Sequence, residues 1–170
     1  MGNGGGRGNR LIMPHDDLAT MTLPENDTSR LDAISAAATE VAAQNVADLL
    51  AMAICHRPDE PALVVCDKRS WLNVVLTEAY RQALPDAAFI DFDDVTPDAV
   101  LAAFADLPAG SLVVLIQSTS FRLEAFRIRI ELFKRGLKVI EHVHLSRMPG
   151  VQGLHYIASL AYDPAYYRGV

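Results

Sequence analysis

The sequence predicts an α/β fold: a three-layer sandwich around a four-stranded, doubly wound parallel sheet of order 2-1-3-4, preceded by a long N-terminal helix. Four short apolar runs alternate with helical patterns, which is typical of a parallel sheet covered by helices on both faces. The run over 111–117 is rich in β-branched residues without polar alternation, which indicates a strand buried on both faces. About fifteen residues separate it from the next apolar run, enough for a helix and a right-handed crossover.

The chain divides into three parts by pattern. Residues 1–26 are expected to form a flexible glycine-rich leader, because the first ten residues include five glycines and show no periodicity. The α/β domain is expected to span 27–162. The final segment, 163–170, is expected to begin a linker or a missing domain.

A long helix opens the predicted domain. Asp27 or Thr28 can cap it, and the helical pattern continues to about Cys55. Many alanines raise its helix propensity and permit close packing. His56 follows at the C-terminal end, where the helix dipole favours a basic residue, so we interpret it as structural rather than catalytic. The predicted apolar face of the helix consists of Leu31, Ile34, Ala38, Val41, Val46, Leu49 and Leu50.

The later elements follow from apolar runs and end signals. Thr96 and Pro97 predict a helix start, with a capping hydroxyl followed by proline at the first helical position. Val65 and Val114 lie in the middle of apolar runs and are expected to be almost fully buried. Strands are predicted over 62–67, 88–92, 111–117 and 137–144, and helices over 71–83, 96–106 and 121–135.

Two patterns compete between the last two strands. Leu123, Phe126, Ile130 and Phe133 recur three or four residues apart, which favours a helix. Residues 126–132, however, alternate apolar and polar side chains, as a half-buried strand would. Length favours the helix, because the segment is too long for a hairpin loop. Glycine at position 136 is suited to end it, since glycine adopts the left-handed conformation without steric cost.

Composition narrows the functional classes. The net charge of −6 argues against nucleic-acid binding, which depends on neutralising phosphates. No apolar run is long enough to cross a bilayer, so no membrane partner is expected. The two cysteines, Cys55 and Cys66, form no metal-ligand pair motif, and no signal-peptide pattern opens the sequence. A cytoplasmic location is therefore expected.

A ligand site is expected beyond the carboxyl ends of the strands, at the switch point between the first and third strands. Basic and hydroxyl groups gather there and suit an anion near a helix N-terminus. The alternative is that Asp67 or Ser70 simply caps the following helix. No glycine lies between Cys66 and Trp71, so dinucleotide and P-loop fingerprints are absent. The predicted ligand-binding residues are Lys68, Arg69, Ser70, Ser118, Thr119 and Ser120.

His142 and His144 form a candidate metal site. Two residues apart on a predicted strand, they point to the same face, which is a known ligand geometry. Further ligands would have to come from elsewhere in the chain. The alternative is that both imidazoles form hydrogen bonds at a strand end.

Several segments resemble the aminopeptidase T family, the thermophilic-type leucyl metallo-aminopeptidases. The resemblance covers about 43–150. It rests on 46–54, 57–60, the strand over 63–67, Gln117-Ser-Thr-Ser120 with the helix after it, and 135–140. The family has a histidine just inside the helix after the Thr-x-Ser turn, where this sequence has Arg122, Leu123 and Glu124.

The resemblance implies a non-catalytic N-terminal α/β domain that helps to frame an active-site cleft. In that family, the metals are held by carboxylates, histidines and a tyrosine of a second, C-terminal domain, and no stretch of this chain matches that domain. The resemblance thus implies no catalytic residue and no cofactor in this chain. Zinc or cobalt would be bound only if a C-terminal metal domain were supplied.

Three functional hypotheses remain open. The first is the non-catalytic domain of a metallo-aminopeptidase-like protein, in which peptide hydrolysis needs the absent metal domain. The second is a stand-alone module that binds a small anion or nucleotide at the carboxyl ends of the strands. The third is a self-contained metallohydrolase that uses His142 and His144.

The C-terminal end predicts a partner. Asp163 and Pro164 give a helix start, but only a few residues follow. Tyr156, Tyr162, Tyr166 and Tyr167 crowd this end, and exposed aromatic side chains suit a covering surface from another domain or subunit, including a homodimer. The alternative is that these tyrosines fold back onto the domain's own sheet.

Overall fold

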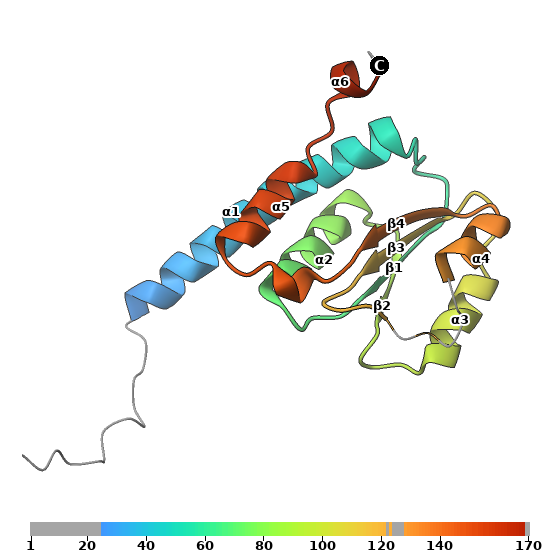
Figure 1. The fold of residues 1–170 in the computed structure, drawn as a ribbon, viewed down its shortest axis with the longest axis horizontal. Coiled ribbons are helices and arrows are strands. Elements are labelled where there is room, and N and C mark those ends of the chain that lie inside the picture. The colour runs from blue at the N-terminus through green and yellow to red at the C-terminus, as the bar shows by residue number, and fades with distance from the viewer. Residues whose placement is uncertain (1–24, 122, 124–127, 169–170) are drawn as a thin grey trace, which may run out of the picture.

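A computed structural model describes residues 25–121, 123 and 128–168, and it confirms the predicted α/β architecture (Figure 1). The four strands form one parallel sheet of order β2-β1-β3-β4, as predicted. The elements are, in order, α1 (Glu25–Asp48), a π-helical turn (Leu49–Ala53), β1 (Ala62–Cys66), α2 (Trp71–Ala83), β2 (Ala88–Asp91), α3 (Pro97–Ala105), β3 (Leu112–Ile116), α4 (Ile128–Lys134), β4 (Lys138–His142), a 3₁₀ turn (Leu145–Arg147), α5 (Val151–Ser159) and α6 (Pro164–Arg168).

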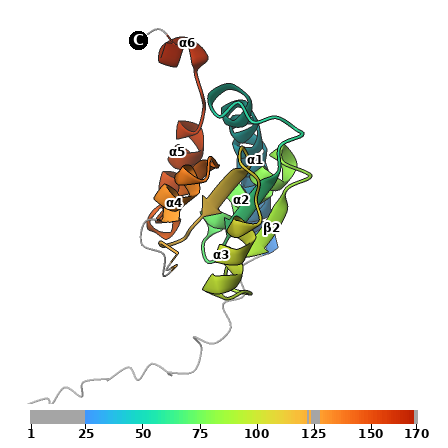
Figure 2. The same cartoon turned by 90° about the vertical axis from the view of Figure 1, so that its right-hand side faces the viewer.

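Helices cover both faces of the sheet. α1, α2 and α5 lie on one face, and α3 and α4 lie on the other (Figures 1 and 2). β1 and β3 are buried along their whole length, and Val65 and Val114 are completely buried, as expected. Successive side chains of β1 enter different cores: Val64 packs with Leu76 of α2, whereas Val65 packs with Phe104 of α3.

The register aligns the carboxyl ends of the strands. Cys66 of β1 lies opposite Asp91 of β2 and Ile116 of β3, and Ile116 in turn lies opposite His142 of β4. The loops that follow these strands therefore leave the sheet at one edge, here called the carboxyl edge. The opposite edge, where the strands begin, is called the amino edge.

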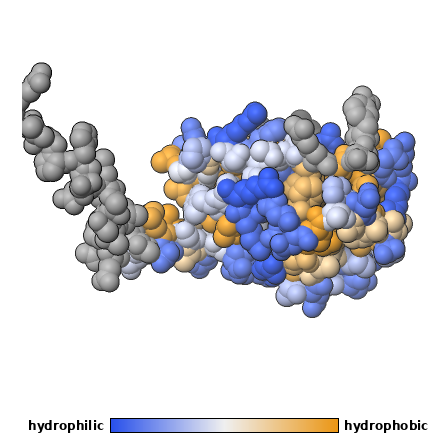
Figure 3. Space-filling model, turned by 90° about the horizontal axis from the view of Figure 1, so that it is seen from below, coloured by the Kyte–Doolittle hydropathy of each residue, from blue (hydrophilic) through white to orange (hydrophobic). Residues whose placement is uncertain are grey.

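The predicted apolar face of α1 is only partly correct. The buried positions are Ala38, Ala42, Val46 and Leu50, four residues apart, whereas Leu31, Ile34 and Val41 are 57%, 49% and 52% exposed. The small alanine side chains let α1 approach α2 closely, and the larger residues then lie away from that contact. Asp27 and Thr28 lie inside α1 rather than capping it, because the helix already includes Glu25. Hydrophobic surface is visible near the beginning of α1 in Figure 3.

The helix before β4 is confirmed in its described part. Residues 128–134 form α4, so the alternating pattern does not produce a strand there, while Arg122 and 124–127 lie outside the described residues. Gly136 has a φ of +74° and ends the helical segment as predicted. β4 is shorter than the predicted 137–144, because His144 adopts a left-handed conformation with φ of +58° and begins a 3₁₀ turn. Within the described ranges, no helix combines the length and apolar character needed to cross a bilayer.

Candidate functional site

Asp67 organises the carboxyl edge. Only 3% of this residue is exposed, and its carboxylate accepts hydrogen bonds from both sides of the switch point. On the β3 side, the backbone amide and hydroxyl of Ser118 both donate to Oδ2 at 2.9 Å. On the β1 side, Asn73 Nδ2 at 2.9 Å and the Arg69 amide at 3.2 Å donate to Oδ1. The carboxylate therefore joins the loops after β1 and β3 from inside the domain.

Ser70 caps α2. Its hydroxyl accepts a hydrogen bond from the Asn73 amide at 3.3 Å and donates to Asn73 Oδ1 at 2.6 Å. Asn73 is completely buried and also donates to Asp67, so the cap and the switch-point network share one side chain. The structure thus gives Ser70 the capping role that was the alternative to ligand binding.

The two basic residues of the predicted site form ion pairs with the end of β2. Lys68 Nζ lies 2.8 Å from Asp91 Oδ2, and the Arg69 guanidinium pairs with the carboxylate of Asp93. The hydrogen bond with Asp91 raises the pKa of Lys68, and the same contact lowers the pKa of Asp91. Both basic side chains are more than half exposed, so each pair lies at the surface with its charge already balanced.

The three hydroxyl residues of the loop after β3 differ in their burial. Ser118 is 2% exposed, and its carbonyl accepts hydrogen bonds from the amide and hydroxyl of Ser146 at 3.1 and 2.7 Å. Thr119 and Ser120 are exposed. The structure therefore brings the two predicted loops to one edge. Of the predicted ligand-binding residues, Lys68, Arg69, Thr119 and Ser120 are exposed, whereas Ser70 is half-buried and Ser118 is buried.

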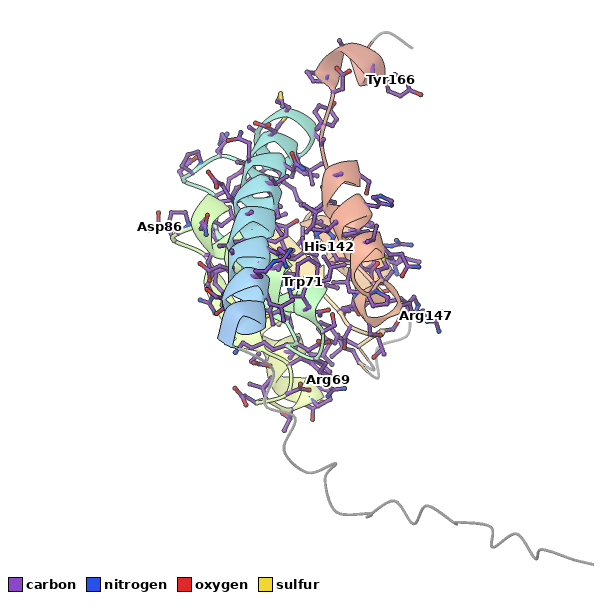
Figure 4. The ribbon with its side chains drawn as sticks, turned by 90° about the vertical axis from the view of Figure 1, so that its left-hand side faces the viewer. Arg69, Trp71, Asp86, His142, Arg147 and Tyr166 are labelled. Atoms are coloured by element: carbon purple, nitrogen blue, oxygen red, sulfur yellow. The ribbon has the colours of Figure 1, made fainter. Side chains whose placement is uncertain are left out.

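His142 lies in the interior, between α1 and α5 in the view of Figure 4. It is 2% exposed, with Nε2 2.8 Å from the hydroxyl of Tyr80 and Nδ1 2.7 Å from the hydroxyl of Tyr156. Burial lowers the pKa of His142 to about 4, so the imidazole is neutral at pH 7, with one nitrogen donating and the other accepting. Burial also raises the pKa of Tyr156 to about 12 and that of Tyr80 beyond its ordinary range.

The two histidines of the candidate metal site have different surroundings. His142 is the last residue of β4, whereas His144 is half-buried on the turn beyond it. Among the described residues, no group of three or more histidine, cysteine, aspartate or glutamate side chains is arranged to hold a metal ion. The hydrogen bonds of His142 match the alternative prediction of a histidine that forms hydrogen bonds at a strand end.

The C-terminal tyrosines differ from one another. Tyr156 folds back onto the sheet, whereas Tyr166 is 68% exposed.

A second polar cluster lies at the amino edge and was not predicted as a site. The side chain of His56 is 5% exposed, with Nδ1 3.3 Å from Oε2 of Glu60. That oxygen already accepts hydrogen bonds from Lys138 Nζ at 2.6 Å and from the Arg57 amide at 2.9 Å. The angles between His56 and Glu60 give no hydrogen bond, and Nδ1 has no other partner among the described residues.

The charges of this cluster are set by these contacts. The hydrogen bond from Lys138 lowers the pKa of Glu60 to about 2, so Glu60 is ionised at pH 7. Desolvation lowers the pKa of His56, although the Glu60 carboxylate acts in the opposite direction. His56 is therefore mainly neutral at pH 7. The spacing of His56 and Glu60, four residues apart, was a local signal, but Lys138 lies far away in the sequence.

Comparisons of this chain with protein-family models, with curated proteins and with solved structures find no match.

Proposed function

We propose that this chain is a non-catalytic α/β domain of a metallo-aminopeptidase-like protein, which acts by association rather than by chemistry at its carboxyl edge. One observation carries the proposal: the buried ionisable groups of this edge are engaged within the domain. Both oxygens of Asp67 accept two hydrogen bonds each, and both nitrogens of His142 are bonded to tyrosine hydroxyls. A general base or metal ligand needs a lone pair that faces the reactant.

The C-terminal helices offer the surface for association. α6 stands away from the sheet in both ribbon views (Figures 1 and 2). On α5, Val151 is 65% exposed and Leu154 is 40% exposed, and Tyr166 on α6 is 68% exposed. Exposed apolar side chains on adjoining helices support contact with a further domain or subunit at this end.

The alternative function, a module for a small anion or nucleotide, is supported by Lys68 and Arg69 at the switch point. We rank it second because Asp91 and Asp93 balance these two charges. An incoming anion would therefore compete with carboxylates that already neutralise these charges.

A peptidase assay tests the proposal. The purified chain is incubated with leucine p-nitroanilide and with zinc or cobalt, and release of p-nitroaniline is measured against metal alone. We expect no turnover above the metal-only rate. Turnover that requires the metal, stops on chelation and is lost in the His142→Phe variant would contradict the proposal.

A further inference from the structure

A cavity of about 540 Å³ lies at the amino edge of the sheet, whereas the predicted ligand site lies at the carboxyl edge. The end of α1 and the loop before β1 form one wall, and the end of α2 and the loop before β2 form the other. Its volume falls within the range of small-molecule sites, roughly 300 to 1,000 Å³. The surface that lines it is mainly aliphatic, with Leu50, Ala51, Leu84 and Pro85 among its contributors.

The polar side chains that line the cavity are three carboxylates, which only accept hydrogen bonds, and one imidazole, which can donate or accept. They are the imidazole of His56 and the carboxylates of Asp59, Glu60 and Asp86. Arg57 and Lys138 lie nearby but do not line the cavity, and they pair with Asp59 and Glu60. Asp86 is exposed and takes part in no ion pair within the described residues (Figure 4). Asp86 therefore adds a negative charge to the cavity lining that no ion pair within the described residues balances.

His56 leaves one buried nitrogen without a hydrogen bond beside the cavity. Its side chain is almost completely buried, yet Nδ1 forms no hydrogen bond, and native proteins rarely leave a buried polar atom in this state. Nδ1 and Glu60 Oε2 lie 3.3 Å apart without a hydrogen bond between them. The other carboxylate oxygen, Oε1, lies 3.7 Å from Arg57 Nε, beyond hydrogen-bonding distance. Within the described residues, Oε1 accepts no hydrogen bond, so a donor group in the cavity would find an acceptor there.

We propose that this cavity binds a small organic amine. The apolar part of the ligand packs against the aliphatic walls, while its ammonium group donates a hydrogen bond to Glu60 and is attracted by the carboxylate of Asp86. A donor suits this cavity because its carboxylates only accept hydrogen bonds, and a positive charge suits it because Asp86 forms no ion pair within the described residues.

Benzylamine is a suitable probe, with benzyl alcohol as its neutral counterpart and benzoate as its anionic one. Each is titrated into ¹⁵N-labelled protein, and the amide resonances of 56–60 and 83–87 are followed by NMR. We expect benzylamine to shift these resonances in a saturable way and to bind at least tenfold more tightly than benzyl alcohol, a difference of about 1.4 kcal/mol. Benzoate should not bind.

Two variants locate the interaction. Asp86→Asn removes the charge but keeps the shape, so it should weaken benzylamine binding several-fold and leave benzyl alcohol binding unchanged. Asp32→Asn is the matched control, because Asp32 is an exposed aspartate fifteen residues before Ala47, roughly 22 Å away along α1. Ala51→Phe places a larger side chain at an exposed position of the cavity lining. It should weaken the binding of both benzylamine and benzyl alcohol. Thermal melts confirm that each variant is folded.

Three outcomes would overturn the proposal. Benzylamine leaves the amides of the cavity unshifted, or it binds no better than benzyl alcohol, or Asp86→Asn and Asp32→Asn weaken it equally. The last result would assign the effect to overall charge rather than to this cavity. None of these outcomes depends on peptidase activity, so the proposal succeeds or fails independently of the proposed function.

Discussion

Replacing Asp67 with alanine tests the network at the carboxyl edge, because this carboxylate serves four donors from two loops. The Ser118 hydroxyl can rotate to another acceptor, and the Arg69 amide lies next to an exposed side chain. The Ser118 amide and Asn73 Nδ2 are fixed and buried, so both lose the carboxylate. Asn73 Nδ2 keeps a second hydrogen bond, to the Ile116 carbonyl at 3.4 Å, so only the Ser118 amide is left without an acceptor. An unsatisfied buried donor costs about 1–3 kcal/mol, so Asp67→Ala should lower the free energy of unfolding by about 1–3 kcal/mol.

Urea unfolding followed by circular dichroism measures this loss, with Asp94→Ala as the matched control. Asp94 is exposed at the same edge, so its replacement should change the free energy of unfolding by less than about 0.5 kcal/mol. Asp67→Asn keeps one of the two oxygen atoms and should cost less than Asp67→Ala, so it remains measurable if the alanine variant does not fold. A loss below about 1 kcal/mol for Asp67→Ala would refute the claim that this carboxylate holds the two loops together.

Three further predictions concern His142, the basic residues and α5. The unfolded chain protonates His142 near pH 6.5 but the folded chain only near pH 4, so its contribution is complete above pH 6.5, and about 3 kcal/mol of stability is lost as the pH falls to 4. His142→Phe should remove that part of the pH dependence in urea unfolding, and an unchanged slope would contradict the low pKa. Replacing both Lys68 and Arg69 with alanine should leave the melting temperature nearly unchanged, because their ion pairs are exposed. If the anion-binding alternative holds, this double variant also weakens phosphate binding in calorimetry, and an unaltered affinity excludes the crevice. Leu154→Ser should weaken association of the chain through its C-terminal end in sedimentation experiments. Val74→Ser changes another exposed apolar residue and should leave that association unchanged, and equal effects of the two substitutions would exclude this surface.

The sheet was predictable from the sequence because its signals are local. β1 and β3 are continuous apolar runs, and such runs form strands that are buried on both faces. The caps at Ser70 and Thr96 and the glycine at position 136 are also local, and all three mark the ends of helical segments in the structure. The face of α1 was not predictable in full, because Leu31 and Ala38 both fit the helical period and only the contact with α2 selects between them.

The position of the candidate site was predictable from the sequence, but the contacts of its side chains were not. Chain order alone brings the loops after β1 and β3 to one edge. The pairing of Lys68 with Asp91 depends on the loop geometry after β2, and the partners of His142 come from α2 and α5, 62 and 14 residues away. No local pattern reports such contacts. For the same reason, His56 was interpreted only as a helix-end residue, since the cavity around it forms from segments far apart in the chain.

Metal content is the most direct test of the claim that this chain is non-catalytic by itself. The purified protein is incubated with excess zinc or cobalt, passed through a desalting column and examined by elemental analysis beside a His142→Phe control. We expect far less than one metal ion per chain, with the same trace in both proteins, because both nitrogens of His142 are bonded to tyrosine hydroxyls. One metal ion per chain that is lost in His142→Phe would contradict that claim.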